Sequence, residues 1–167
     1  MKKFDIRNQV VIMCGISGAG KTHFALDLVK DGFIRLSTDV LIWEKVGDKL
    51  SSLSIEERKK LFAECREEVF TQLNNLIETG SKVVIDATNC KRIVRDKIRE
   101  LCVNKGVSPI FVYCFADKEE LKHRLSQRKG TGPDDLVVTE EEFQNYWLGF
   151  ERPLEDESDI IYYKTDY

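Results

Sequence analysis

The sequence predicts an α/β fold, a three-layer sandwich of about five parallel strands with helices on both faces and a helical lid. Short apolar, β-rich runs alternate with segments of helical periodicity along the chain, which is the element order of a parallel sheet. The runs are continuously apolar, as in strands buried on both faces. A length of 167 residues without linker or repeat predicts one domain over residues 1–167.

The first half of the chain predicts two strands and three helices. Residues 9–14 and 33–37 are β-rich apolar runs, and helical spacing of apolar residues follows at 21–30 and 40–46. The longest helix begins at the capping box Ser54-Ile-Glu-Glu57, and its apolar residues lie on one stripe that ends at a glycine. The order strand, helix, strand, helix fits a parallel sheet.

The second half continues the alternation. Strands are expected at residues 82–86, 107–115 and 160–163. Helices are expected around residues 93–102, from Asp117 to about Arg128, and after the capping box of residues 139–142. The segment 129–137 contains two glycines, a proline and two aspartates and is typical of a mobile loop. With the helix before it, this loop forms the expected lid, residues 117–138.

Composition excludes few functions but points to an ordinary globular protein. Charged residues make up 33% of the chain and the net charge is -3, which argues against a globally basic nucleic-acid binder. Without a signal peptide or a stretch of about 20 apolar residues, we expect a cytoplasmic protein with no membrane contact, and no partner protein is evident. The odd number of cysteines without paired spacing predicts reduced core residues: Cys14, Cys65, Cys90, Cys102 and Cys114.

Residues 15–22 read Gly-Ile-Ser-Gly-Ala-Gly-Lys-Thr, the Walker A pattern of a phosphate-binding loop, or P-loop. Glycines let backbone N–H groups converge on phosphate oxygens, and the following helix adds the positive end of its dipole. We expect ATP and Mg²⁺ as cofactors, with Lys21 as a catalytic residue at the outer phosphates and Thr22 as a metal ligand. The expected nucleotide-binding residues are Gly15, Ser17, Gly18, Ala19, Gly20, Lys21 and Thr22. The predicted fold class is therefore a P-loop NTPase sandwich.

Two aspartates follow predicted strands, where ligands of open α/β sheets bind. Asp86 ends the third strand and is the expected second metal ligand, directly or through water. Asp39 follows the second strand and is the expected catalytic base and acceptor contact for a hydroxyl group. Each has a structural alternative: Asp86 as a turn or helix cap, and Asp39 as the N-cap of the next helix.

Arginines on two predicted helices are further candidates. Arg124 and Arg128 are four residues apart and share a helix face, which suits a catalytic clamp on the transferring phosphoryl group as well as a solvated basic face. Arg92 and Arg95 lie on a stripe for which solvation is the default expectation. Because they are near a strand end, they are also candidate acceptor-binding residues together with Asn89.

These motifs, together with Ser37-Thr38-Asp39, Asp86-Ala-Thr-Asn89 and Arg124-x-x-x-Arg128, resemble the small P-loop kinases grouped with polynucleotide 5′-hydroxyl kinases and zeta toxins. The resemblance spans nearly the whole chain. It implies a five-stranded parallel sheet, ATP and magnesium at the Walker lysine and its hydroxyl neighbour, the aspartate after the second strand as general base, and lid arginines on the phosphates. One departure is that Ile42 stands where kinases of nucleic-acid ends typically place an arginine.

The leading hypothesis is an ATP-dependent kinase that transfers the γ-phosphate to a hydroxyl of a polynucleotide 5′ end or of a small-molecule alcohol. A regulatory ATPase is the first alternative, although Asp86 is followed by Ala87 rather than by a second acidic residue. A nucleoside-monophosphate-type kinase with a phosphate acceptor is the second. That acceptor requires basic residues nearby, and none follows Asp39 before Lys45.

Overall fold

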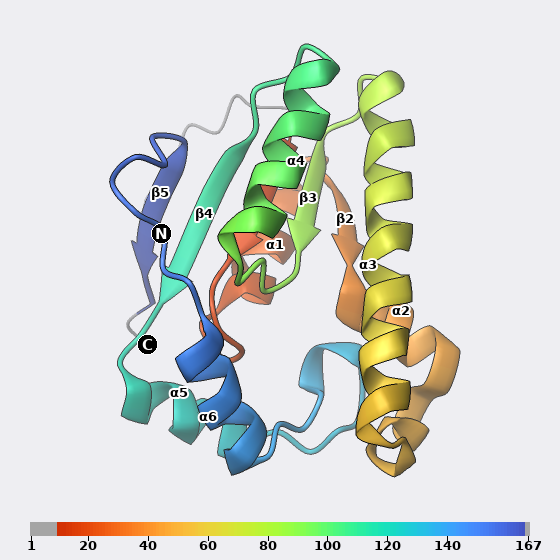
Figure 1. The fold of residues 1–167 in the computed structure, drawn as a ribbon, viewed down its shortest axis with the longest axis vertical. Coiled ribbons are helices and arrows are strands. Elements are labelled where there is room, and N and C mark those ends of the chain that lie inside the picture. The colour runs from red at the N-terminus through yellow and green to blue at the C-terminus, as the bar shows by residue number, and fades with distance from the viewer. Residues whose placement is uncertain (1–9, 166–167) are drawn as a thin grey trace.

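The computed structural model describes residues 10–165, and its five strands form one parallel sheet in the order β2-β3-β1-β4-β5 (Figure 1). The strands are β1 (Val10–Cys14), β2 (Ile34–Ser37), β3 (Val83–Asp86), β4 (Ile110–Phe115) and β5 (Ile160–Lys164). The predicted parallel sheet is confirmed. Residue 9, the expected start of the first strand, lies outside the described residues. β4 begins three positions later than predicted, directly after Pro109, which has no N–H for the ladder.

Helices connect the strands and cover both faces of the sheet. They are α1 (Lys21–Lys30), α2 (Thr38–Val46), α3 (Ile55–Glu78), α4 (Arg92–Asn104), α5 (Lys118–Ser126) and α6 (Glu140–Gly149), with 3₁₀ turns η1 (Gly47–Ser52) and η2 (Pro133–Asp135). Both predicted capping boxes form, at Ser54 with Glu57 and at Thr139 with Glu142. These caps fix the residues at which α3 and α6 begin.

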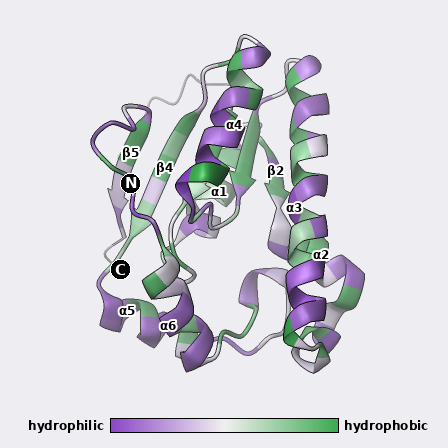
Figure 2. Cartoon of the chain, in the orientation of Figure 1, coloured by the Kyte–Doolittle hydropathy of each residue, from purple (hydrophilic) through white to green (hydrophobic). Residues whose placement is uncertain are grey.

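The core consists of two apolar layers, one on each face of the sheet. Val11 and Met13 pack with α1, α5 and α6, whereas Val10 and Ile12 pack with α3 and α4, because successive side chains of a strand point to opposite faces. All five residues of β1 are buried, as the continuous apolar run predicts. Figure 2 shows the same division, with hydrophobic colour along the central strands and hydrophilic colour on the outer faces of the helices.

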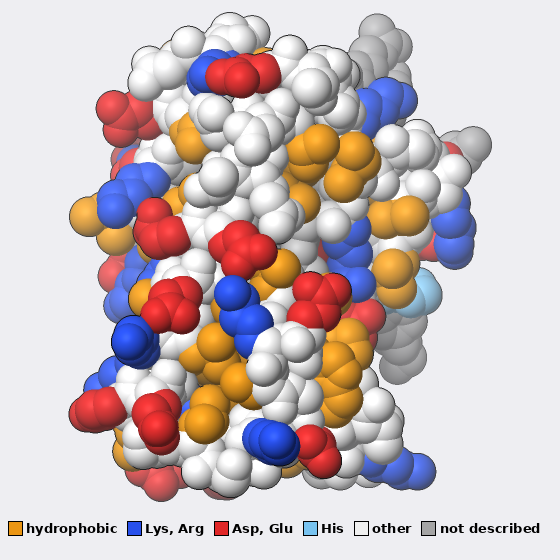
Figure 3. All heavy atoms as spheres, turned by 90° about the vertical axis from the view of Figure 1, so that its right-hand side faces the viewer, with side chains coloured by type: hydrophobic (Ala, Val, Ile, Leu, Met, Phe, Trp, Pro, Cys, Tyr) orange, Lys and Arg blue, Asp and Glu red, His pale blue; other side chains and the backbone are white. Residues whose placement is uncertain are grey.

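The outer surface is mixed in character. On the side of α3, acidic and basic side chains alternate with apolar ones (Figure 3). None of the helices in residues 10–165 is long and apolar enough to cross a membrane. The five cysteines are free, and four are buried as expected, but Cys90 is partly exposed because it lies in the loop after β3. The prediction of a core position is wrong for Cys90.

Candidate nucleotide-binding site

The P-loop joins β1 to α1 at the carboxyl edge of the sheet. Gly15, Gly18 and Gly20 have positive φ angles of 141°, 85° and 82°. A Cβ atom on Gly15 would lie 2.3 Å from the carbonyl oxygen of Cys114, so only glycine lets the loop pass this close to β4. The Gly15 N–H donates to the Thr88 carbonyl at 3.0 Å, which ties the loop to the end of β3 as well.

The predicted Walker residues open α1. Lys21 is buried, and its Nζ donates to the Ile16 carbonyl within the loop at 3.0 Å. Burial lowers the pKa of Lys21, while Asp86 and then Asp39 act in the opposite direction. Thr22 is half-buried beside Lys21 and lines the cavity next to the loop. A lysine facing two carboxylates keeps its charge more readily than burial alone allows.

A cavity of about 400 Å³ lies at the carboxyl ends of β1, β2 and β3. The predicted site residues that the structure brings together on its wall are Ser17, Lys21, Thr22, Asp39, Asp86 and Arg128. These residues are spread over most of the sequence, and they meet because parallel strands end at the same edge. The cavity has the size and mixed apolar and polar lining of a ligand site.

Asp86 is held by an arginine that the sequence analysis missed. Its side chain is buried at the end of β3, and Arg35 on β2 donates to one of its carboxylate oxygens, from Nε at 2.9 Å and from Nη2 at 2.6 Å. Burial alone would lower the pKa of Arg35, but hydrogen bonds to Asp134 and Asp86 raise it. A signal was available, since a charged residue inside an apolar strand run requires a charged partner.

Asp39 lies in the first turn of α2, half-buried at the cavity. The alternative interpretation of Asp39 as the N-cap is wrong, because the Ser37 hydroxyl occupies that position and accepts from the Val40 N–H at 3.4 Å. Burial raises the pKa of Asp39; Lys21 opposes the rise and Asp86 adds to it. A carboxylate that carries no capping role and has a raised pKa is suited to accept a proton.

The two lid arginines, expected to act as a pair, have different surroundings. Arg128 lines the cavity and donates to the Leu136 carbonyl at 3.0 Å. Arg124 is absent from the cavity wall and donates to the Gly18 carbonyl at 3.2 Å and to the hydroxyl and carbonyl of Thr165 at 2.9 and 2.8 Å. Thr165, the residue after β5, supplies two of these three acceptors, so Arg124 ties the P-loop to the end of the sheet.

Arg95 is not solvated, and it does not line the cavity. Its guanidinium is fully buried and forms two hydrogen bonds with the Glu157 carboxylate, at 2.8 Å from Nε and 2.7 Å from Nη2. Burial alone would raise the pKa of Glu157, but the hydrogen bonds from Arg95 and then Arg99 lower it to about 2. The expectation of a surface arginine is wrong because the segment before β5 covers α4 and supplies the carboxylate.

The other two acceptor candidates are also engaged elsewhere. The Asn89 side chain donates to the Met13 carbonyl at 2.7 Å and is buried. Arg92 binds both carboxylate oxygens of Asp156 at 2.8 Å, at the surface. Neither residue lines the 400 Å³ cavity. Both side chains stabilise the loop after β3 and the start of α4, and Asn89 also lines a smaller pocket of about 110 Å³ beside the cavity.

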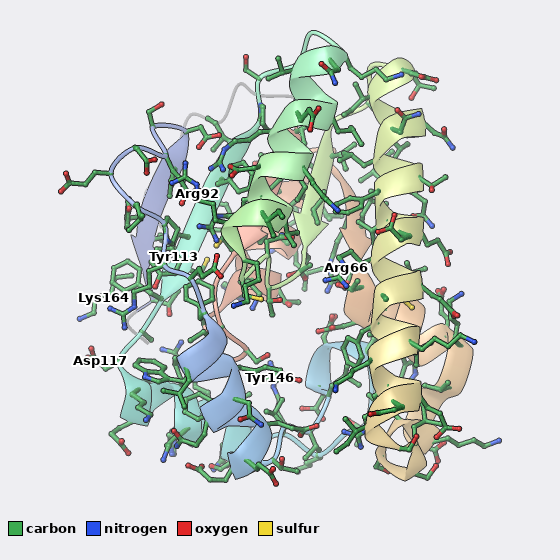
Figure 4. The ribbon with its side chains drawn as sticks, viewed as in Figure 1. Arg66, Arg92, Tyr113, Asp117, Tyr146 and Lys164 are labelled. Carbon is green, nitrogen blue, oxygen red and sulfur yellow. The ribbon has the colours of Figure 1, made fainter. Side chains whose placement is uncertain are left out.

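The far wall of the cavity comes from residues whose position in a site no sequence motif indicated. It contains Phe62 and Arg66 of α3, Lys91 before α4, and Asn145 and Tyr146 of α6. In the sequence these residues look like ordinary helix surface. Figure 4 shows Arg66 extending from α3 across the space in front of the sheet, with Tyr146 on α6 at the other side of that space.

The donor set suits magnesium that arrives with a nucleotide. Among the described residues no group of three or more His, Cys, Asp or Glu side chains could hold a metal ion. One hydroxyl and two carboxylates, of Thr22, Asp39 and Asp86, nevertheless line one cavity. Mg²⁺ is commonly bound by one or two such oxygen ligands together with substrate phosphates and water. The residues present therefore fit a magnesium–nucleotide complex and not a protein-only metal centre.

The glycine loop between a buried strand and a helix, at the carboxyl edge of this five-stranded sheet, defines a P-loop NTPase-like fold. The chain belongs to the AAA_33 family of AAA domains, whose model matches residues 10–153. A comparison with curated proteins finds no match.

Solved structures of kinases share this fold. An unliganded sugar kinase from Janibacter sp. HTCC2649 is 22% identical, with a TM-score of 0.66 over 94% of this chain and 85% of that one. The APS kinase CysC of Mycobacterium tuberculosis, in complex with AMPPNP and APS, is 17% identical, with a TM-score of 0.57 over 96% and 90%. A chain of the Pnkp1/Rnl/Hen1 RNA repair complex is 20% identical, with a TM-score of 0.65 over 84% of this chain and 43% of that one.

Proposed function

We propose that this chain is a magnesium-dependent kinase that transfers the γ-phosphate of ATP to a hydroxyl group. The observation that carries the proposal is the position of Asp39, which lines the same cavity as Lys21 and Thr22 and does not cap its helix. A general base at this place suits an acceptor that must lose a proton. An ATPase that transfers to water does not require a cavity of this size at its general base.

The proposed roles follow from position and charge. The P-loop N–H groups and Lys21 would bind the outer phosphates. Thr22 and Asp86 would hold the magnesium ion, which would neutralise charge on the phosphate oxygens. The acceptor oxygen attacks the γ-phosphorus, its proton passes to the Asp39 carboxylate, and ADP leaves. Arg128, on the cavity wall, stabilises the charge on the transferring group.

The acceptor is a small-molecule alcohol or a polynucleotide 5′-hydroxyl, and two observations favour the small molecule. Ile42, at the position of the arginine in polynucleotide kinases, is fully buried and packs with Leu61 and Cys65. It therefore has no access to an acceptor. A long polyanion is bound by a continuous basic surface, whereas the charges on the α3 side alternate in sign (Figure 3).

The test is transfer from γ-labelled ATP to a panel of alcohols, sugars and 5′-hydroxyl oligonucleotides. Asp39→Asn should lower kcat by roughly 100- to 10,000-fold, the usual contribution of a general base, and leave binding of magnesium–ATP intact. Lys21→Ala should lower kcat and also weaken the binding of magnesium–ATP. The control is Asp48→Asn, an exposed carboxylate in the turn after α2. Full activity of Asp39→Asn would contradict the base assignment, and acceptor-independent ATP hydrolysis would instead indicate a regulatory ATPase.

A second candidate is a kinase with a phosphate acceptor, because the structure brings Arg66 and Lys91 into the cavity that holds Asp39. A mononucleotide phosphate would find there the basic residues that the sequence around Asp39 lacks. Incubation with nucleoside monophosphates separates the two candidates. A phosphoanhydride product would support the second candidate, and a phosphate ester would support the first.

A further inference from the structure

Arg66 stands where three cavities of the molecule adjoin. It lines the 400 Å³ cavity at the P-loop, a pocket of about 110 Å³ between α3 and the loop after β3, and a groove of about 730 Å³ between α3 and α6. Phe62, one turn earlier on α3, lines all three as well, because residues four apart share a helix face. Figure 4 shows Arg66 on the side of α3 that lies toward the strands.

Arg66 is also the cavity cation whose hydrogen-bonding groups are uncommitted. The other three cations on the cavity wall bind protein oxygens: Lys21 binds the Ile16 carbonyl, Lys91 the Glu151 carboxylate and Arg128 the Leu136 carbonyl. Within residues 10–165, Arg66 makes no hydrogen bond or ion pair. On the same helix, Arg58 is paired with Glu142 and Lys60 with Glu64. Lys59 makes no hydrogen bond or ion pair within the described residues, but it does not line the 400 Å³ cavity.

The acidic groups of the cavity do not offer Arg66 a partner either. Asp86 and Asp134 are both bound by Arg35, and Asp39 faces Lys21 and Arg128. The planar guanidinium presents several N–H donors in a fork that matches a carboxylate or phosphate. The 110 Å³ pocket beside it adds the polar residues Thr38, Thr88 and Lys91 over an apolar floor. This set of groups is complementary to an oxyanion and unfavourable for a cationic ligand.

We propose that Arg66 binds an oxyanion of the acceptor, so that the acceptor is an alcohol carrying a phosphate or carboxylate group. The inference rests on the proposed kinase function. Thr38, which lines the pocket with Arg66, immediately precedes Asp39 in the chain. An acceptor with its anion at Arg66 therefore directs a hydroxyl elsewhere on the molecule toward Asp39 and the γ-phosphate. The anion orients the acceptor and does not itself react.

The first arm of the test measures anion binding without turnover. Magnesium–AMPPNP fills the P-loop, and inorganic phosphate or acetate is then titrated by nuclear magnetic resonance and by thermal shift. We expect saturable binding that Arg66→Ala weakens by about tenfold or more, the range of a charge-assisted hydrogen bond, and Arg66→Lys by less. The matched control is Lys60→Ala on the same helix, 81% exposed and outside these cavities. No binding, or equal binding by Arg66→Ala and wild type, would overturn the inference.

The second arm measures transfer from ATP to matched acceptors: glucose against gluconate and glucose 6-phosphate, and thymidine against thymidine 3′-phosphate. The anionic member of each set should be the better substrate, and Arg66→Ala should raise its KM about tenfold while changing the neutral member less than twofold. Preference for thymidine 3′-phosphate would indicate that the natural acceptor is a nucleic-acid end. Preference for gluconate or glucose 6-phosphate would indicate a small metabolite. Equal use of neutral and anionic acceptors would overturn the inference about Arg66 but would remain consistent with the proposed kinase function. If anions bind in the first arm but no hydroxyl compound is phosphorylated in the second, the result would contradict the proposed kinase function instead.

Discussion

The Arg35 guanidinium donates two hydrogen bonds to one carboxylate oxygen of Asp86, at 2.9 and 2.6 Å, across neighbouring strands. The same guanidinium binds Asp134 in the turn η2. One arginine therefore links the proposed metal ligand at the end of β3 to the segment that follows α5. Its side chain is 13% exposed, whereas that of Asp134 is 40% exposed, so the link to Asp86 is the buried half of this bridge.

The first prediction concerns that segment. Asp134→Ala removes its ionic contact with β2, and an exposed pair of this kind contributes about 0–1 kcal/mol. Amide hydrogen exchange in residues 129–138 of the nucleotide-free protein should therefore accelerate severalfold, with little change in overall stability. The control is Asp117→Ala, which removes a carboxylate that is 86% exposed. Unchanged exchange would mean that Arg35 does not restrain the segment.

The second prediction is the acid limb of the pH–rate profile. The base must be ionised to accept a proton, and burial raises the pKa of Asp39. Activity should therefore fall as the pH drops through a value above about 4, the ordinary pKa of an aspartate. The measurement is kcat/KM against pH for wild type. The control variant Asp48→Asn should lose activity over the same pH interval as wild type. A limb at or below pH 4 would argue against Asp39 as the titrating group.

The third prediction compares a P-loop glycine with a glycine after α4, in order to separate the cost of steric overlap from the cost of backbone strain. Gly15 and Gly106 both have positive φ, but a Cβ atom at Gly106 meets nothing within 4 Å, whereas at Gly15 it meets the Cys114 carbonyl. Gly106→Ala should cost about 1–2 kcal/mol for the positive φ alone. Gly15→Ala should cost more and should also abolish ATP binding, because the loop or β4 must move. Chemical denaturation and nucleotide titration test this, and equal costs would contradict it.

The fourth prediction concerns pH and stability through Glu157. Its pKa is about 2 in the folded protein against an ordinary value of 4.5. Its ionised form therefore stabilises the fold above pH 4.5, by roughly 3 kcal/mol, and this contribution is lost as the pH falls toward 2. The stability difference between wild type and Glu157→Gln should shrink over that interval in urea unfolding. The control Glu64→Gln, in an exposed pair, should give a small difference that is nearly independent of pH.

Much of the molecule follows from local patterns in the sequence. The apolar run of β1, the capping box at Ser54 and the glycines of the P-loop each act over a few residues, and the structure confirms the elements they predict. The placement of Asp39 and Asp86 at one edge also follows, because parallel strands all end on the same side of the sheet. Boundaries differ by a few residues: β4 begins late, after Pro109, and α5 ends at Ser126, so Arg128 lies beyond the helix on which it was expected.

Local patterns in the sequence therefore suffice for the P-loop sandwich and for the motif residues at the carboxyl edge of its strands. Which charges meet depends on the folded chain, since Arg35 and Asp86 are 51 positions apart and Arg95 and Glu157 are 62 apart. The fold also turned Arg66 toward the cavity and Arg124 away from it. An ion pair depends on distance through space. Strand pairing sets that distance for Arg35 and Asp86, and the packing of the segment before β5 on α4 sets it for Arg95 and Glu157.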